Sequence, residues 1–233
     1  MNILVVAAHP DDEILGVGGT IAKHVDNGDG VYALILGEGG TSRFENRKDA
    51  QEGLVEALHG NTRKAAAVLG IREVSFENFP DNRFDSVDLL DIVKAVERKI
   101  GILRPSIVYT HHGGDLNVDH TLTYRAVLTA TRPMEDQPVQ ELYAFETVSS
   151  TEWNFAYGDA QFAPNVFVKL TKEQFERKLT AMQAYETELC AYPHPRSLDM
   201  LRAVACRWGG VAGARYVEAF EAVRSGFSTD SLL

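Results

Sequence analysis

The fold is decided near the start of the chain by the sequence ILVVAAHPDDE, which spans residues 3–13. Its first six residues, 3–8, form a continuous apolar run of the length of one buried strand. Pro10 fixes the turn that follows, so that His9 and Asp12 could point the same way with Asp11 beside them. The sequence therefore predicts a buried strand that ends in an imidazole and three carboxylates.

Apolar runs and amphipathic stretches alternate through the first half of the chain. We predict strands at residues 3–8, 31–36, 73–76 and 106–110, and helices at 13–26, 48–69 and 87–103. The second helix could be broken at Gly60, and the third has apolar residues close to the helical period of 3.6. Buried strands separated by helices indicate an α/β fold with a mostly parallel central sheet and right-handed crossovers.

The pattern changes after the fourth predicted strand. We expect a helix at residues 119–130, which Pro133 prevents from continuing, and an extended segment at 141–148. Residues 171–174 form a capping box that opens a helix towards Leu189. A proline-rich connector at 192–197 leads into another helix, and residues 216–223 could be a late strand. The sequence has no internal repeat and no linker, so we expect one domain over residues 1–233.

Composition is that of a globular protein, with 45% hydrophobic and 24% charged residues. Lys and Arg number 23 against 33 for Asp and Glu, and the net charge of −10 disfavours nucleic acid and anionic membranes as partners. Cys190 and Cys206 are too few for a disulfide scaffold or a cysteine-rich zinc module. The apolar start is too short for a secretory signal, and no run approaches the ~20 residues that cross a bilayer. We expect a cytoplasmic protein without a membrane span.

Polar clusters follow the four predicted strands directly. They begin at His9, Gly37, Pro80 and His111. In an open parallel sheet, ligands gather outside the carboxyl ends of the strands. The four clusters therefore predict one site at that edge of the sheet.

The first cluster indicates a metal site. His9 is followed by three carboxylates, on Asp11, Asp12 and Glu13, whose mutual repulsion a divalent cation would relieve. Histidine and aspartate together suit Zn²⁺ or a neighbouring transition metal. In a purely structural interpretation the aspartates stabilise a helix N-terminus. That interpretation accounts for one carboxylate, but not for an adjacent histidine and a second aspartate.

The second cluster, residues 111–120, could supply the remaining ligand. His120 begins a predicted helix and could face back into the site, whereas in the alternative Asp119 only caps that helix and the histidines are polar loop residues. Three protein ligands leave a coordination position open for water, whose pKa zinc lowers to about 7. Asp11, adjacent and unligated, would be the general base. The expected chemistry is metal-assisted hydrolysis of a polarised carbonyl.

These motifs resemble those of the LmbE-like, or PIG-L, family of metal-dependent N-acetylglucosamine-type deacetylases. Residues 8–13 (AHPDDE) and 115–120 (DLNVDH) match its two motifs, and segments 63–70, 193–197 and 217–220 are also similar. The resemblance implies a Rossmann-like three-layer sandwich and a zinc site that another divalent cation could occupy. It implies that His9, Asp12 and His120 are metal ligands, that Asp11 is the base, and that Asp119 orients or tunes a neighbouring group.

One position departs from the family pattern. Several members carry a histidine three residues before the last ligand, where this chain has Asn117. An amide can donate a hydrogen bond to an oxyanion, but it cannot protonate a leaving amine at neutral pH. We therefore consider His194, held between Pro193 and Pro195, as the general acid. A packing or capping role for this histidine is an equal alternative.

Arginines are the remaining candidates for substrate binding. Four lie on or near the expected rim, namely Arg43, Arg63, Arg83 and Arg196. Together they could bind a phosphate or carboxylate of the substrate, although each one singly is more often a surface ion pair.

The expected function is removal of the N-acetyl group from a small-molecule amino sugar, free or linked to a nucleotide or carrier, by a chain that could form a homo-oligomer. Two alternatives stay open: a metal-dependent amidase for another acyl-amine conjugate, and a non-catalytic sugar- or nucleotide-binding module. A dinucleotide-binding oxidoreductase is disfavoured. Gly16 and Gly18 lie inside a predicted helix, and Ile21 stands where the third glycine of the fingerprint would be.

Overall fold

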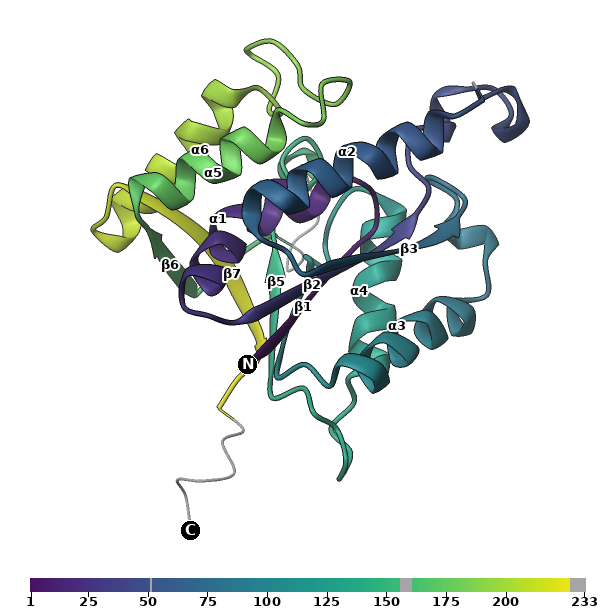
Figure 1. Ribbon diagram of the computed structural model, residues 1–233, viewed down its shortest axis with the longest axis horizontal. Coiled ribbons are helices and arrows are strands. Elements are labelled where there is room, and N and C mark those ends of the chain that lie inside the picture. The colour runs from purple at the N-terminus through teal and green to yellow at the C-terminus, as the bar shows by residue number, and fades with distance from the viewer. Residues whose placement is uncertain (51, 156–160, 227–233) are drawn as a thin grey trace.

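In this computed structural model, which describes residues 1–50, 52–155 and 161–226, a seven-stranded sheet lies between two layers of helices (Figure 1). The strands are β1 (Asn2–Ala7), β2 (Gly30–Gly37), β3 (Glu73–Phe79), β4 (Ile107–His111), β5 (Glu141–Phe145), β6 (Val166–Leu170) and β7 (Tyr216–Arg224). The helices are α1 (Asp12–Asp26), α2 (Leu54–Leu69), α3 (Leu89–Leu103), α4 (Val118–Ala130), α5 (Lys172–Met182) and α6 (Leu198–Ala212).

The strand order is β3-β2-β1-β4-β5-β7-β6. The pairs from β3 through to β5 are parallel, whereas β7 runs antiparallel to both β5 and β6. The predicted α/β class, a three-layer sandwich with a mostly parallel central sheet, is confirmed. The carboxyl ends of β1, β2, β3 and β4 consequently lie along one edge, where the polar clusters follow them.

Alternating side chains of β1 show how the layers form. Ile3 and Val5 pack into a core with residues of α1, α2, α5 and α6, and Leu4 and Val6 pack into a second core with residues of α3 and α4. All four are fully buried. Because successive side chains of a strand point to opposite faces, an uninterrupted apolar run is required wherever helices cover both faces.

Several elements differ from their predicted extent, among them strands β3 and β5 by three residues each, and one strand was not predicted. Helix α2 begins at Leu54 rather than at residue 48, because Gly53 has a left-handed backbone (φ 81°), and it continues through Gly60 without a break. Helix α5 ends at Met182, before the buried Tyr185, rather than near Leu189. Strand β6 was not predicted, since it is a short strand at the edge of the sheet with mostly half-buried side chains.

A buried ion pair reaches the backbone of α1. The Lys178 ammonium donates to the carbonyl oxygen of Leu15 at 2.7 Å and to Glu218 Oε1 at 2.6 Å. The Glu218 carboxylate accepts from the backbone N–H groups of Gly19 at 2.9 Å and Thr20 at 2.6 Å. In a regular helix the carbonyl of Leu15 and the N–H of Gly19 pair with each other. The ion pair therefore ties α1 to α5 and β7 through backbone groups.

Glycines in α1 permit this close approach. A Cβ atom at Gly16 would lie 2.1 Å from a ring carbon of Phe145, and one at Gly19 would lie 2.3 Å from Leu170. The glycines lie inside α1 and serve helix packing, which is the interpretation that the sequence favoured over a dinucleotide site. No helix in the described part of the chain is long and apolar enough to cross a membrane.

We expect Gly16→Ala to lower the free energy of unfolding by about 1–3 kcal/mol, because the added methyl group overlaps Phe145 in a filled core. The matched control is Gly60→Ala in α2, where an added Cβ meets no atom within 4 Å. That substitution should raise the unfolding free energy by about 0.5–1 kcal/mol through helix propensity. Urea unfolding measures both, and equal effects at the two positions would contradict the packing account.

Candidate metal centre and active site

His9 lies between carboxylates at the carboxyl end of β1. Its Nδ1 atom is 3.3 Å from Asp12 Oδ2, and its Nε2 atom is 2.9 Å from Asp119 Oδ2 and 3.3 Å from Asp81 Oδ1. Asp119 is fully buried, and its Oδ1 atom accepts the backbone N–H of Phe84 at 2.9 Å. Asp119 therefore fixes the orientation of the His9 ring with Nδ1 towards Asp12.

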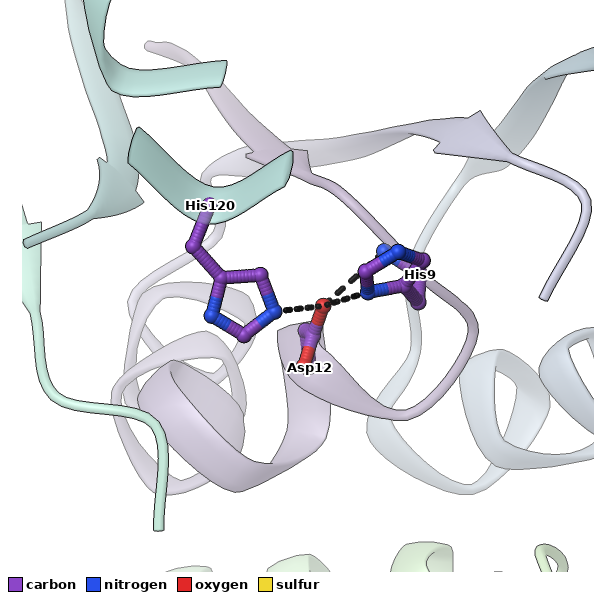
Figure 2. A group of neighbouring side chains, drawn as sticks. All are labelled: His9, Asp12 and His120. Carbon is purple, nitrogen blue, oxygen red and sulfur yellow. Dashed lines mark hydrogen bonds and ion pairs between the residues drawn. The ribbon is translucent and has the colours of Figure 1, made fainter. Parts of the chain in front are cut away.

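His120 is held in the same manner from α4. Its Nε2 atom is 3.3 Å from Asp12 Oδ2, and its Nδ1 atom is 3.2 Å from Asp115 Oδ1. Asp115 in turn accepts hydrogen bonds from the hydroxyl groups of Ser150 and Thr151. Figure 2 shows the Asp12 carboxylate between the two rings. A carboxylate on the far nitrogen of a histidine is the arrangement that orients metal-ligating imidazoles.

The donor set fits a divalent cation. Candidate ligand atoms of His9, Asp12 and His120 lie within 4.8 Å of one another. Asp12 is 1% exposed, and its Oδ1 atom is buried without a hydrogen-bond partner among the described residues. A buried carboxylate oxygen without a partner requires compensation, which a cation beside two imidazole nitrogens supplies.

A second group with candidate ligand atoms within the same 4.8 Å consists of His9, Asp81 and Asp119. There the His9 Nε2 atom already pairs with Asp119, whose other oxygen is bonded to a backbone N–H. The group that contains Asp12 has the unpartnered oxygen and is the better metal position.

The carboxylates and imidazoles at this position shift one another's pKa values. Burial opposes ionisation of Asp12, but the imidazoles of His120 and His111 hold its pKa well below the usual range. Burial likewise disfavours the charged form of His120, yet Asp12 and Asp115 raise its pKa to about 9. A metal ion at Nε2 would therefore compete with a proton.

The other histidines of the second cluster have different partners. His111 accepts the backbone N–H of Ala8 at its Nε2 atom (2.9 Å), and burial followed by the charge of His120 lowers its pKa to about 3. His112 lies 2.7 Å from Glu221 through its Nδ1 atom. His120 Nε2 lies closer to Asp12 Oδ2 than the Nε2 atom of His111 does.

Asp11 occupies an unusual backbone position beside the metal ligands. Its φ of 103° lies in the left-handed region that disfavours side-chain-bearing residues. The N–H of Asp11 donates to Glu13 at 3.1 Å, and Tyr185 donates its hydroxyl hydrogen to the same carboxylate at 2.5 Å. Burial raises the pKa of the Asp11 carboxyl, and Arg196, 2.9 Å away, opposes that rise. Tyr185 and Arg196, from distant parts of the chain, therefore help to fix the position of Asp11.

A cavity of about 110 Å³ opens at this edge. Its lining includes His9, Asp11, Asp81, Asn117, Arg43, Glu188 and Arg196. A larger cavity of about 400 Å³ begins at Ile107 and Glu141, the first residues of β4 and β5, and therefore lies towards the opposite edge. Aromatic side chains of Tyr109, Tyr143 and Phe220 form part of its wall. We place the candidate site at the smaller cavity, because His9 and Asp11 line it and lie beside Asp12.

Asn117 has two roles in the structure. Its Oδ1 atom caps α4 by accepting the N–H of Asp119 at 2.8 Å, and its Nδ2 atom donates to Asn82 Oδ1 at 2.8 Å. The amide has a second N–H that could serve an oxyanion. His194 accepts the backbone N–H of Arg196 at its Nδ1 atom and lies edge-on to Trp153, outside the lining of the cavity.

The structure brings two of the four candidate arginines to the cavity. Arg43 and Arg196 line it, whereas the Arg63 guanidinium lies 5.1 Å from the centre of the Phe76 ring and Arg83 is exposed at the start of a 3-10 turn. Helix α2 presents Arg63 to β3, which explains its distance from the cavity.

Sequence reasoning missed four supporting residues. Asp115 stands inside the quoted 115–120 motif and could have been found there. Glu13 lies next to the ligands, but Tyr185 and Glu188 carry no local signal and approach only through the fold.

Comparison with known proteins places this chain in a family. Residues 4–131 match the family model described as GlcNAc-PI de-N-acetylase, PIG-L. The chain is 29% identical over 191 residues to an uncharacterized deacetylase, YaiS, of Escherichia coli (80% of this chain, 91% of that protein). It is 29% identical over 194 residues to a probable N-acetyl-alpha-D-glucosaminyl L-malate deacetylase 2 of Bacillus cereus (80% and 83%).

Solved structures share the fold. An N,N'-diacetylchitobiose deacetylase from Pyrococcus horikoshii superposes with a TM-score of 0.75 at 17% identity, covering 99% of this chain and 87% of that one. GalB, a 4-carboxy-2-hydroxymuconate hydratase from Pseudomonas putida, gives 0.74 at 22% identity, with 100% and 99% covered. The fold thus occurs in proteins named for more than one chemistry, whereas the two relatives compared by sequence above are named as deacetylases. The chain belongs to the GlcNAc-PI de-N-acetylase (PIG-L) family.

Proposed function

We propose that this chain is a zinc-dependent hydrolase that removes the N-acetyl group from an amino sugar or amino-sugar conjugate. The observation that carries the proposal is the buried Asp12 carboxylate between two carboxylate-oriented imidazoles, with Asp11 beside it at a cavity. Family membership and relatives named as deacetylases support hydrolysis. The set of two histidines and one aspartate supports zinc, and it leaves a coordination position open.

The chemistry divides between the cation and the protein. A divalent cation held by His9, Asp12 and His120 would lower the pKa of a bound water and polarise the amide carbonyl. The Asp11 carboxylate would accept the proton that this water loses. Arg196 favours the ionised form of Asp11, which a base requires. Asp115 and Asp119 act through the two imidazoles, whose coordinating nitrogens they keep towards Asp12.

The leaving amine must receive a proton. His194 could supply it from Nε2, since its Nδ1 atom accepts a backbone hydrogen bond. His194 does not line the cavity, however, whereas Asp11 does. Return of the abstracted proton by Asp11 is therefore the more direct route, with the second N–H of Asn117 available to the oxyanion.

Asp11→Asn tests the base. The expected result is a fall in kcat of about 10²–10⁴, because an amide cannot accept the proton while the metal ligands are intact. Acetate release from a panel of N-acetylated amino sugars measures it, with zinc content determined on the same samples. Full activity in the variant would remove Asp11 from the mechanism. A zinc-loaded wild type that releases no acetate from the panel would favour another amide substrate or a binding role.

Asp115→Asn tests the support of the metal centre. Loss of the carboxylate opposite His120 should weaken zinc binding about 10–100-fold, because the imidazole loses its orienting and polarising partner. Competition with a chromophoric chelator measures the affinity. The control is Asp136→Asn in the exposed loop before β5, which should bind zinc as the wild type does. Equal affinity in all three proteins would show that Asp115 does not act on the metal.

A further inference from the structure

Glu188 lies where the two arginines of the cavity meet. Its Oε2 atom accepts from Arg43 Nη2 at 2.5 Å and from Arg196 Nη1 at 3.2 Å, and its Oε1 atom accepts from the Thr187 hydroxyl at 3.2 Å. The carboxylate is only 7% exposed, whereas the arginine side chains are 52% and 24% exposed. A single buried carboxylate therefore compensates two guanidinium groups at the cavity.

Arg196 is engaged further. Its Nη1 atom also donates to Asp11 Oδ2 at 2.9 Å, and its Nε atom donates to Ser149 Oγ at 2.7 Å. Among the described side chains that line the cavity, the carboxylates of Asp11 and Glu188 pair with the guanidinium groups of Arg43 and Arg196, and Asp81 adds a further carboxylate. These side chains leave no excess positive charge for a substrate anion. The carboxylates of Asp12 and Asp119 lie on the metal side, where they offset the charge of a divalent cation.

The rest of the lining includes neutral hydrogen-bonding side chains on three loops, beside the apolar Pro10 and Leu58. Asn117 donates to Asn82, and Asn82 donates to the Ser42 hydroxyl at 3.0 Å, so that a chain of amide and hydroxyl groups joins three loops. Sugar hydroxyl groups can both donate to and accept from such groups. A phosphate, by contrast, binds best to a free guanidinium fork, and here Glu188 competes for both forks.

From this arrangement we infer that Glu188 is a specificity-determining residue, which restricts the proposed deacetylation to uncharged amino sugars and disfavours substrates with a phosphate or carboxylate near the acetamido group. The inference rests on the proposed function for its substrate. It also revises the sequence-based expectation for Arg43 and Arg196, which would contact hydroxyl groups rather than bind an anion.

The test compares two substrates in three zinc-loaded proteins. The substrates are methyl N-acetylglucosaminide, which is neutral, and N-acetylglucosamine 1-phosphate. The proteins are the wild type, Glu188→Gln, and the matched control Glu186→Gln, an exposed glutamate of the same segment. We expect the wild type to prefer the neutral glycoside in kcat/KM. Glu188→Gln should shift the ratio of the two kcat/KM values towards the phosphate ester by about tenfold, because a guanidinium freed from Glu188 can form a charge-assisted hydrogen bond with the phosphate. Glu186→Gln should leave this ratio unchanged.

Two outcomes overturn the inference: a wild type that prefers the phosphate ester, or a ratio that Glu188→Gln does not change. The wild-type comparison needs no variant, so it stands even where Glu188→Gln fails to fold. Glu188→Asp keeps the charge and should keep a preference for the neutral substrate, which separates charge from packing.

If the wild type releases acetate neither from these two substrates nor from the panel of N-acetylated amino sugars, the proposed function fails by itself. Titration with inorganic sulfate then tests Glu188 directly. About tenfold tighter binding by Glu188→Gln than by the wild type supports the inference, and equal binding overturns it.

Discussion

The carboxylate of Asp12, shared between the imidazoles of His9 and His120, is the contact on which the site depends. An unpaired buried charge is costly, so this carboxylate can lie at the end of β1 only with partners around it. The partners come from the turn between β1 and α1 and from α4, which the parallel order of β1 and β4 brings to one edge. Sheet topology therefore creates the charge cluster, and the cluster fits the divalent cation that the proposed function requires.

The surrounding structure holds this cluster in place. Asp119 and Asp115 orient the two rings, while Glu13 and Tyr185 keep the N–H of the left-handed Asp11 satisfied. The ion pair of Lys178 and Glu218 anchors the helix that carries Asp12. The contacts of Tyr185, Lys178 and Glu218 join α1 to later parts of the chain. Asp11 and Asp12 therefore lie on a firmly anchored segment, and a preorganised site requires such support.

Much of this arrangement could be predicted because its signals are local. The apolar run 3–8, the polar residues directly after it and the 115–120 motif indicated the parallel sheet, its active edge and the candidate ligands. The tertiary contacts could not be predicted in this way. Glu188 meets Arg43 across 145 residues and Tyr185 meets Glu13 across 172, and no periodicity reports such pairs. The prediction that Arg63 lies at the rim was wrong. Its place in the segment 63–70, which is similar to the family, did not bring its side chain to the cavity.

The most direct test of the account is diffraction at the zinc absorption edge from crystals of the zinc-loaded protein. The account predicts an anomalous peak about 2.0–2.2 Å from His9 Nδ1, His120 Nε2 and an oxygen of Asp12. A peak on the other side of the His9 ring, between Nε2, Asp81 and Asp119, would contradict it, as would the absence of a peak at this edge of the sheet.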